Sequence, residues 1–336
     1  MRYTNLGKRG PKVSVIGLGL WQAGSPSWGT SADSSLIREI VNGVREAVGL
    51  GINFFDTAEI YGWGYSERIL GEALRSLERE MPDLVIATKV GGFRVTRKQI
   101  IKAAESSRRR LGIKSIGLLQ LHWPPPAWIP LCNVIKSLEH AVKIGIAEYY
   151  GLSNFPEKLQ ARALACAKSI EPVSNQIQYN LAYRAPEQAL IGEAVELGLG
   201  IIAWSPLAKG ALAGVTSPRT KAQRGDPVFR EAASNSKLQE TLSRISEAHG
   251  VSRAQIALAW LISKGAIPIP GFRRSRRVKE YAASAKVELS EDDIKLLDSI
   301  TKEYIHKWGK GYSLLKYLRY TPCWLQYLVL RLSGGI

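Results

Sequence analysis

The chain has 336 residues, 45% of them hydrophobic, which is enough for a sizeable core and suits a single α/β barrel. It contains no run of roughly 18 apolar residues for a membrane-spanning helix, and its N-terminal residues lack the long apolar stretch of a secretory signal. The net charge of +17 is spread along the chain without a nucleic-acid-binding motif, so we interpret it as a basic surface rather than a nucleic-acid site.

Eight short apolar segments are predicted to be buried strands. They are rich in Ile, Val and Leu and nearly continuously apolar, which is typical of parallel strands that are covered on both faces. In chain order they are residues 13–20, 52–56, 84–89, 116–121, 148–153, 175–178, 200–204 and 266–270.

Helical patterns lie between these strands. The first, over residues 34–51, ends at Gly51, which is a plausible helix stop. A strand–helix alternation repeated eight times predicts a (β/α)8 barrel, with a long loop over 205–232 after strand seven and helices around 236–264. The other predicted helices are residues 66–80, 97–112, 133–145, 156–169 and 186–198.

Polar side chains stand at the predicted carboxyl ends of several strands. Asp56 ends the second strand, and Tyr61 follows it within the next loop. Lys89 ends the third strand, and His122 follows the fourth. Because functional residues of a (β/α)8 barrel lie on its C-terminal face, we expect these four side chains at one mouth.

Together, these four groups could transfer one proton to or from a substrate oxygen. A free tyrosine titrates at about pH 10, and an adjacent ammonium such as Lys89 lowers that pKa. Asp56 would keep Lys89 charged, and His122 would donate a hydrogen bond to a substrate oxygen or help relay a proton. Tyr61 would then act as general acid toward a carbonyl oxygen or general base toward an alcohol, while a cofactor supplies the hydride.

An ordered series of motifs resembles the aldo-keto reductases, especially their bacterial, archaeal and channel-β-subunit-like branch. The resemblance runs from about residue 2 to residue 300. It implies NADPH-dependent reduction of aldehydes or ketones on a (β/α)8 barrel, with Asp56, Tyr61, Lys89 and His122 as the catalytic tetrad. The motifs are "INFFDTAEIYGWGYSERILGEAL", "VIATKVG", "LLQLHWPPP", "YYGLSNF", "NQIQYN", "IIAWSPLAKGALAG" and "IPIPGF".

The same resemblance implies which residues bind the cofactor. Ser153, Asn154 and Gln176 would hold the carboxamide, and Trp204 would stack on the nicotinamide ring. The loop after strand seven would follow the pyrophosphate, and the residues after strand eight would surround the adenosine phosphate and the adenine. The other residues of this set are Trp21, Ser205, Pro206, Leu207, Gly210, Gly271, Phe272, Arg273, Arg277 and Glu280.

A group of arginines supports NADP(H) independently of the resemblance. The segment "GFRRSRRVKE" (271–280) places four arginines within five positions, after the last strand and before a helix. Guanidinium groups and a helix N-terminus make a good phosphate site, which a 2′-phosphate would use. The chain has no G-x-G-x-x-G fingerprint, so a Rossmann domain is not indicated.

Five tryptophans are predicted on the same face as the tetrad. They either pack the loops or line an aromatic pocket for apolar carbonyl compounds, and both interpretations stay open. We assign three of them, Trp28, Trp63 and Trp123, to the substrate pocket; the whole set is Trp21, Trp28, Trp63, Trp123 and Trp128.

We expect one barrel domain over residues 1–303 and a C-terminal extension over residues 304–336. The extension mixes aromatic, leucine and basic residues. For its early part, a flap over the substrate mouth is the preferred interpretation. The alternatives are a subunit contact or a membrane-surface segment, the latter motivated by the apolar residues between Trp324 and Leu330.

The remaining expectations concern location and partners. The three cysteines, Cys132, Cys166 and Cys323, have no metal-ligand spacing, and their odd number does not suggest a disulfide framework. We therefore expect a cytoplasmic enzyme without a metal, acting on a small carbonyl or alcohol substrate and not on nucleic acid. A cofactor-binding regulatory subunit with slow or vestigial reductase activity is the alternative function.

Overall fold

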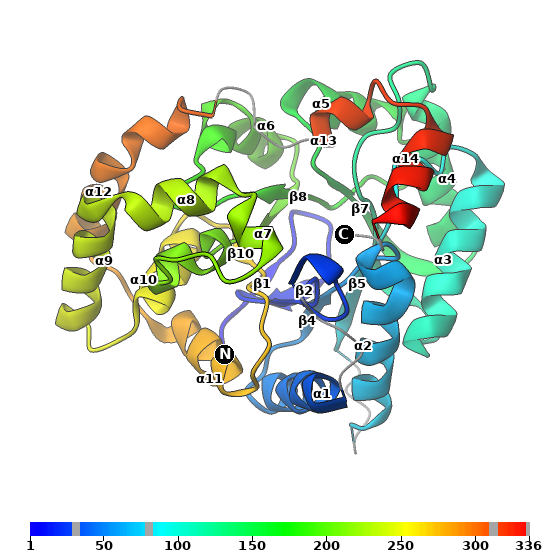
Figure 1. Cartoon of the computed structure of the whole chain (residues 1–336). Coiled ribbons are helices and arrows are strands. Elements are labelled where there is room, and N and C mark those ends of the chain that lie inside the picture. The colour runs from blue at the N-terminus through cyan, green and yellow to red at the C-terminus, as the bar shows by residue number, and fades with distance from the viewer. Residues whose placement is uncertain (29–33, 78–82, 309–314, 334–336) are drawn as a thin grey trace.

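The centre of the structure, a computed structural model that describes residues 1–28, 34–77, 83–308 and 315–333, is an eight-stranded parallel sheet. Each strand from β3 to β10 pairs with its neighbour in the chain, and a parallel bridge between Gly19 and Gly271 closes the sheet on itself (Figure 1). Helices surround the sheet, as the strand–helix alternation predicts. The predicted (β/α)8 barrel is therefore confirmed.

The barrel strands are as deeply buried as their continuous apolar patterns predict. Every residue of β5 and of β6 is buried, because the barrel interior covers one face and the helices cover the other. The strands are β3 (Leu18–Gly19), β4 (Phe54–Asp56), β5 (Val85–Val90), β6 (Ile116–Leu121), β7 (Ala147–Ser153), β8 (Ser174–Gln178), β9 (Gly200–Trp204) and β10 (Ile267–Pro268).

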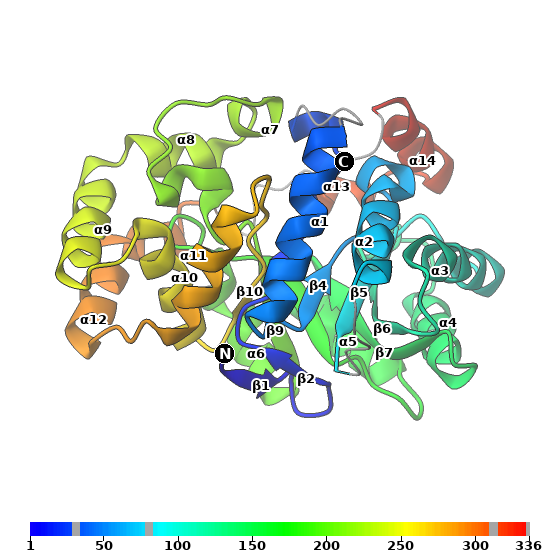
Figure 2. The ribbon, with the colours of Figure 1, turned by 90° about the horizontal axis from the view of Figure 1, so that it is seen from below.

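The predicted first strand, residues 13–20, divides into two parts. Its beginning is β2 (Lys12–Ser14), which pairs antiparallel with β1 (Tyr3–Asn5), and only β3 joins the barrel. Figure 2 shows this hairpin at one end of the barrel and α7 and α14 at the opposite end. The hairpin thus lies away from the C-terminal face, where the tetrad is expected.

Each predicted helical segment contains a helix, and the helix ends follow local rules. The helix predicted over residues 66–80 ends earlier, at Arg75, and residues 78–80 lie outside the described part of the chain. Thr96 and Gln99 form a capping box at the start of α3, and Gly112, with φ of 69°, ends it. The helices that cover the barrel are α1 (Ser34–Gly49), α2 (Tyr65–Arg75), α3 (Arg97–Leu111), α4 (Leu131–Lys143), α5 (Glu157–Cys166), α6 (Leu190–Glu196), α9 (Ser236–Ala248), α10 (Arg253–Ser263), α11 (Arg276–Ala283) and α12 (Glu291–Ile300).

The segment after β9 is more ordered than the predicted long loop. It contains η4 (Ala208–Ala213), α7 (Lys221–Arg224) and α8 (Pro227–Ser234), and α7 contacts η1 (Pro26–Trp28). Asp226 caps α8 and pairs with Lys209 at 2.6 Å, which ties the two ends of this segment together.

The cysteines differ from the expectation. Cys132 of α4 and Cys166 of α5 form a disulfide, although they are 34 residues apart, and Cys323 is free. Sequence spacing did not indicate this pair, because it is the packing of α5 against α4 that brings the two cysteines together.

Candidate active site

The four residues of the predicted tetrad meet at the carboxyl ends of neighbouring strands. Asp56 ends β4, Lys89 lies in β5, and His122 follows β6, while Tyr61 begins η2 (Tyr61–Gly64). The Lys89 Nζ donates to Asp56 Oδ1 at 2.5 Å, to the Thr57 carbonyl at 2.9 Å and to Tyr61 Oη at 3.4 Å. The rings of Tyr61 and His122 are 5.6 Å apart, so all four side chains share one site.

The second oxygen of Asp56 is held by two glutamines. Gln120 Nε2 donates to Asp56 Oδ2 at 3.0 Å, and Gln176 Nε2 donates to the same oxygen at 2.8 Å. Gln176 Nε2 also donates to Gln120 Oε1 at 3.2 Å. Sequence reasoning did not single out Gln120, although a glutamine within the apolar β6 is the kind of signal that could have found it.

Burial keeps both Tyr61 and His122 in their neutral forms. It raises the pKa of Tyr61 well above the ordinary 10.0, and the Asp56 carboxylate adds to that shift. It lowers the pKa of His122 well below 6.5, with a further contribution from Lys89. The expected lowering of the Tyr61 pKa is not found, because burial and the Asp56 carboxylate both raise it.

The residues predicted to hold a carboxamide contact one another. Asn154, with φ of 58°, donates from Nδ2 to the His122 carbonyl at 2.9 Å and accepts from Trp204 Nε1 at 3.0 Å. Ser153 Oγ donates to the Gln176 carbonyl at 3.1 Å. In the described part of the chain no donor reaches Gln176 Oε1, so this atom can accept a hydrogen bond from a ligand.

The loop after β9 forms a cradle of unusual backbone. Ser205 and Lys209 have φ values of 52° and 53°, and Gly210 has 105°. The buried Ser205 Oγ and His122 Nδ1 have no hydrogen-bond partner among the described residues. Strained backbone and unsatisfied polar atoms are typical of ligand sites, so these residues fit a phosphate-bearing cofactor. The other two loop residues of the predicted set are buried: Pro206 and Leu207.

Two of the four arginines after β10 already have acidic partners. Arg277 pairs with Glu280 at 2.6 Å, and Arg274 lies 3.9 Å from Glu39. Glu280 also accepts a hydrogen bond from Ser252 Oγ at 2.6 Å. Arg277 and Glu280, both predicted to bind the adenosine end, are therefore held to each other.

The other two arginines, Arg273 and Arg276, are exposed and have no ion pair among the described residues. They lie at the N-terminus of α11, where backbone N–H groups and a positive helix end favour a phosphate. Phe272, in contrast, is buried, and its ring packs against Gly43 of α1. A ligand could therefore reach only the backbone of Phe272. The neighbouring Gly271 is half-buried.

Two tryptophans after β3 lie near Tyr61. The ring of Trp21 is 6.5 Å from that of Tyr61 and packs edge-on against Trp28 at 5.5 Å. The indole nitrogens of Trp21 and Trp28 are buried without a partner among the described residues. Trp63 and Trp123 belong to or pack against the same apolar cluster as Tyr61, and we call the four tryptophans Trp21, Trp28, Trp63 and Trp123 the aromatic wall.

The C-terminal extension covers this aromatic wall from outside the barrel. It contains α13 (Leu315–Leu318) and α14 (Cys323–Leu332). Trp123 Nε1 donates to Gln326 Oε1 at 3.0 Å, and Trp63 Nε1 donates to the Leu330 carbonyl at 3.2 Å. Leu330 also joins the apolar cluster that contains Tyr61, so α14 packs beside the tetrad; part of the early extension, where a flap was expected, lies outside the described residues.

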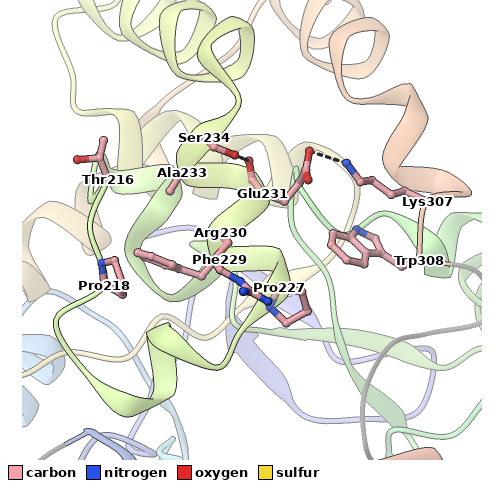
Figure 3. Close-up of a pocket in the computed structure, with 10 residues that line it drawn as sticks. All are labelled: Thr216, Pro218, Pro227, Phe229, Arg230, Glu231, Ala233, Ser234, Lys307 and Trp308. Atoms are coloured by element: carbon pink, nitrogen blue, oxygen red, sulfur yellow. Dashed lines mark hydrogen bonds and ion pairs between the residues drawn. The ribbon is translucent and has the colours of Figure 1, made fainter.

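A cavity of about 590 Å³ lies elsewhere on the rim, between α8 and the residues after η6 (Lys302–Ile305), as Figure 3 shows. The Lys307–Glu231 ion pair, 2.6 Å long, closes one side of it. The tetrad does not line this cavity, so we do not assign it to catalysis. Its lining is Thr216, Pro218, Pro227, Phe229, Arg230, Glu231, Ala233, Ser234, Lys307 and Trp308.

The described residues contain no group of His, Cys, Asp or Glu side chains suited to hold a metal ion. None of their helices is long and apolar enough to cross a membrane.

Comparison with known proteins gives concordant results. Residues 15–302 match the model of the aldo/keto reductase family. The chain is 32% identical to the chloroplastic pyridoxal reductase of Arabidopsis thaliana, over 88% of this chain and 86% of that protein. It is 30% identical to a probable voltage-gated potassium channel subunit beta of the same plant, over 85% and 92% of the two chains. An aldo-keto reductase from Klebsiella pneumoniae, solved in complex with NADPH, superposes with a TM-score of 0.76 at 26% identity, covering 93% of this chain and 98% of that one.

Proposed function

The chain belongs to the aldo/keto reductase family, and we propose that it reduces aldehydes or ketones to alcohols, reversibly, with Tyr61 as the proton donor. It is an oxidoreductase that uses NADP(H). The observation that carries the assignment of Tyr61 is its contact with Lys89, 3.4 Å from Nζ to Oη, in a site where Lys89 is paired with Asp56.

Tyr61 is suited to donate its proton. Lys89 is an ammonium and can only donate to Tyr61 Oη, so the phenolic proton remains available for a substrate oxygen. Once that proton has left, the ammonium stabilises the phenolate. Asp56 keeps Lys89 charged, because without it burial would favour the neutral amine. NADPH, when bound, supplies the hydride that no side chain can supply.

Neutral His122 is suited to donate a hydrogen bond to the substrate oxygen. Burial and Lys89 hold its pKa well below 6.5, so at neutral pH the imidazole has one N–H donor and one acceptor. It can therefore donate a hydrogen bond to a polarised carbonyl without carrying a charge, or help relay a proton to Tyr61.

The cofactor would be held by residues in or directly after five of the barrel strands, β3, β7, β8, β9 and β10. Ser153, Asn154 and Gln176 Oε1 suit the carboxamide, and Trp204 suits the ring. The cradle that begins at Ser205, together with Trp21 and Lys209, suits the pyrophosphate; Lys209 Nζ lies over the Trp21 ring, 5.4 Å from its centroid. The exposed Arg273 and Arg276 suit the 2′-phosphate.

The substrate is proposed to be an uncharged apolar or aromatic carbonyl compound. Trp63 packs against the apolar cluster that contains Tyr61, and Trp28 packs against Trp21, whose ring lies next to that of Tyr61. Trp123 is fully buried beneath α14. We keep residues 1–303 as one barrel domain and residues 304–336 as an extension that acts as a flap. A cytoplasmic location also stays a prediction, and the Cys132–Cys166 disulfide weakens it, since disulfides are rare in reducing compartments.

A panel of aldehydes, ketones and alcohols assayed with NADPH and NADH tests this proposal. Turnover of simple aromatic aldehydes at about 1 s⁻¹ or more would support the enzyme. The similarity to a potassium channel subunit favours one alternative, a cofactor-binding regulatory subunit. Tightly retained NADPH with turnover several hundredfold slower would support that alternative instead.

A further inference from the structure

The outward face of α14 carries an apolar stripe that the described part of the chain leaves uncovered. Trp324, Leu328 and Leu332 recur every four residues, and 67%, 44% and 78% of their respective surfaces are exposed. The opposite face carries Gln326 and Leu330, which are buried over the aromatic wall. This helix therefore has an apolar surface on both sides, and the barrel accounts for only one of them.

A second segment extends the stripe. The Ala127 N–H donates to the Arg319 carbonyl at 2.7 Å, which fixes the loop after β6 beside the turn before α14. That arrangement adds Trp128, 57% exposed, and Tyr320, 73% exposed, to the same region. Contiguous exposed apolar surface of this kind marks an interaction site. We call it the outer apolar patch, and it consists of Trp128, Tyr320, Trp324, Leu328, Val329 and Leu332.

The charge of the extension indicates what the patch contacts. Residues 304–336 contain no Asp or Glu, so the extension is positively charged, as is the whole chain with its net charge of +17. Exposed tryptophan, tyrosine and leucine beside cations are the composition of segments that lie in the interface of an anionic bilayer. Within the described residues 315–333 the basic residues are Lys316, Arg319 and Arg331, whereas Lys307 is already paired with Glu231.

We propose that the outer apolar patch docks peripherally on an anionic lipid bilayer. The contact is peripheral because none of the described helices could span a membrane. A second copy of the chain suits the patch less well. A two-fold contact through this face would bring together two copies of residues 315–333, each with three basic residues and no acidic residue within that segment.

Docking has a consequence for substrate supply, which rests on the proposed reductase function. The inner face of α14 roofs the aromatic wall beside Tyr61, so a docked helix would place the substrate site directly behind the bilayer surface. Apolar carbonyl compounds concentrate in bilayers rather than in water. The patch would therefore bring the enzyme to the phase in which such substrates accumulate.

Vesicle flotation of the full-length protein tests the proposal. We expect the wild type to float with vesicles of phosphatidylglycerol and phosphatidylcholine (1:1) and to be released by high salt, but not to float with phosphatidylcholine alone. The triple variant Trp324→Ser, Leu328→Ser, Leu332→Ser should bind at least about tenfold less. Val195→Ser is the matched control, because Val195 is 61% exposed on α6 and lies outside the patch.

Three results would overturn docking: no flotation with either vesicle, equal binding to both vesicles, or a dimer in solution that the triple variant dissociates. Circular dichroism and turnover of a water-soluble aldehyde should be the same in the triple variant and the wild type, which separates lost docking from misfolding. If no carbonyl compound is reduced by any form, the reductase function fails while the flotation result still decides the docking.

Discussion

Gln120 Nε2 donates a hydrogen bond to Asp56 Oδ2 at 3.0 Å, while the other oxygen of the same carboxylate accepts from Lys89. Asp56 is 2% exposed, so its second oxygen depends on protein donors, and Gln176 is the other one. Gln120 thus helps to orient the carboxylate that pairs with Lys89, the proposed catalytic lysine. Its Oε1 also accepts a hydrogen bond from Gln176, a predicted cofactor residue.

Replacement of Gln120 by leucine should therefore disturb catalysis without a direct contact to substrate. A hydrogen bond to a buried charge contributes about 1.5–3 kcal/mol, so we expect kcat to fall by roughly tenfold or more. With one donor fewer, the Asp56 charge acts more strongly on Tyr61 and raises its pKa further. Carbonyl reduction needs protonated Tyr61, so its rate falls at high pH when Tyr61 loses its proton. In the variant, this fall in rate should occur at a higher pH than in the wild type. Steady-state kinetics across pH would show this, and an unchanged profile would refute the positioning role.

Replacement of Tyr61 by phenylalanine removes only the phenolic oxygen. We expect carbonyl reduction to fall by at least about a hundredfold, since general acid catalysis is lost, while NADPH binding changes little. NADPH oxidation measures the first effect, and fluorescence titration with NADPH measures the second. Turnover near that of the wild type would remove Tyr61 from the mechanism.

The two unpaired arginines should determine the preference for NADPH. Arg276→Ala is expected to weaken NADPH binding about tenfold and NADH binding much less, because a charge-assisted contact to the 2′-phosphate is lost. Arg277→Ala should have a smaller effect, because Arg277 is engaged by Glu280. Dissociation constants for both cofactors are the measurement, with Arg244→Ala, at an exposed position on α9, as the control. An equal loss for NADPH and NADH would contradict the phosphate role.

His122 should make the folded state sensitive to acid. Its pKa in the folded protein lies well below 6.5, so the unfolded chain binds the proton more readily. Above about pH 6.5, His122 is neutral in both states and its contribution to the free energy of unfolding has its full value. As the pH falls below that value, the unfolded chain takes up the proton and this contribution is lost. Urea titrations at pH 7.5 and 5 should show a smaller decrease for His122→Asn than for the wild type. His306→Asn, at an exposed position, should behave like the wild type.

The disulfide between α4 and α5 should stabilise the outer helices of the barrel. It closes a loop of 34 residues, for which the chain-entropy model gives about 3–4 kcal/mol. Cys132→Ser should lower the Tm and remove its dependence on reducing agent in thermal unfolding. Cys323→Ser, which removes the free thiol, should leave both unchanged. A wild type whose Tm is indifferent to reducing agent would show that the bond contributes little.

The sequence by itself determined the barrel and indicated which strand ends meet on one face. Continuous apolar strands alternating with helical patterns suit one closed parallel sheet, and such a sheet brings the ends of β4, β5 and β6 to one face. Asp56, Lys89 and His122 could therefore be predicted to meet, although they are far apart in the chain. Their chemical roles rest on the resemblance and on this geometry together.

Only the tertiary structure decided how these groups affect one another. The role of Gln120, the pairing of Cys132 with Cys166 and the division of the arginines depend on contacts between segments that no local pattern encodes. The direction of the Tyr61 pKa shift depends on how deeply the phenol is buried and how near the Asp56 carboxylate lies, which are matters of distance in space. The two faces of α14 became distinguishable only when one of them was packed over the aromatic wall, because periodicity shows which side chains share a face but not what covers it.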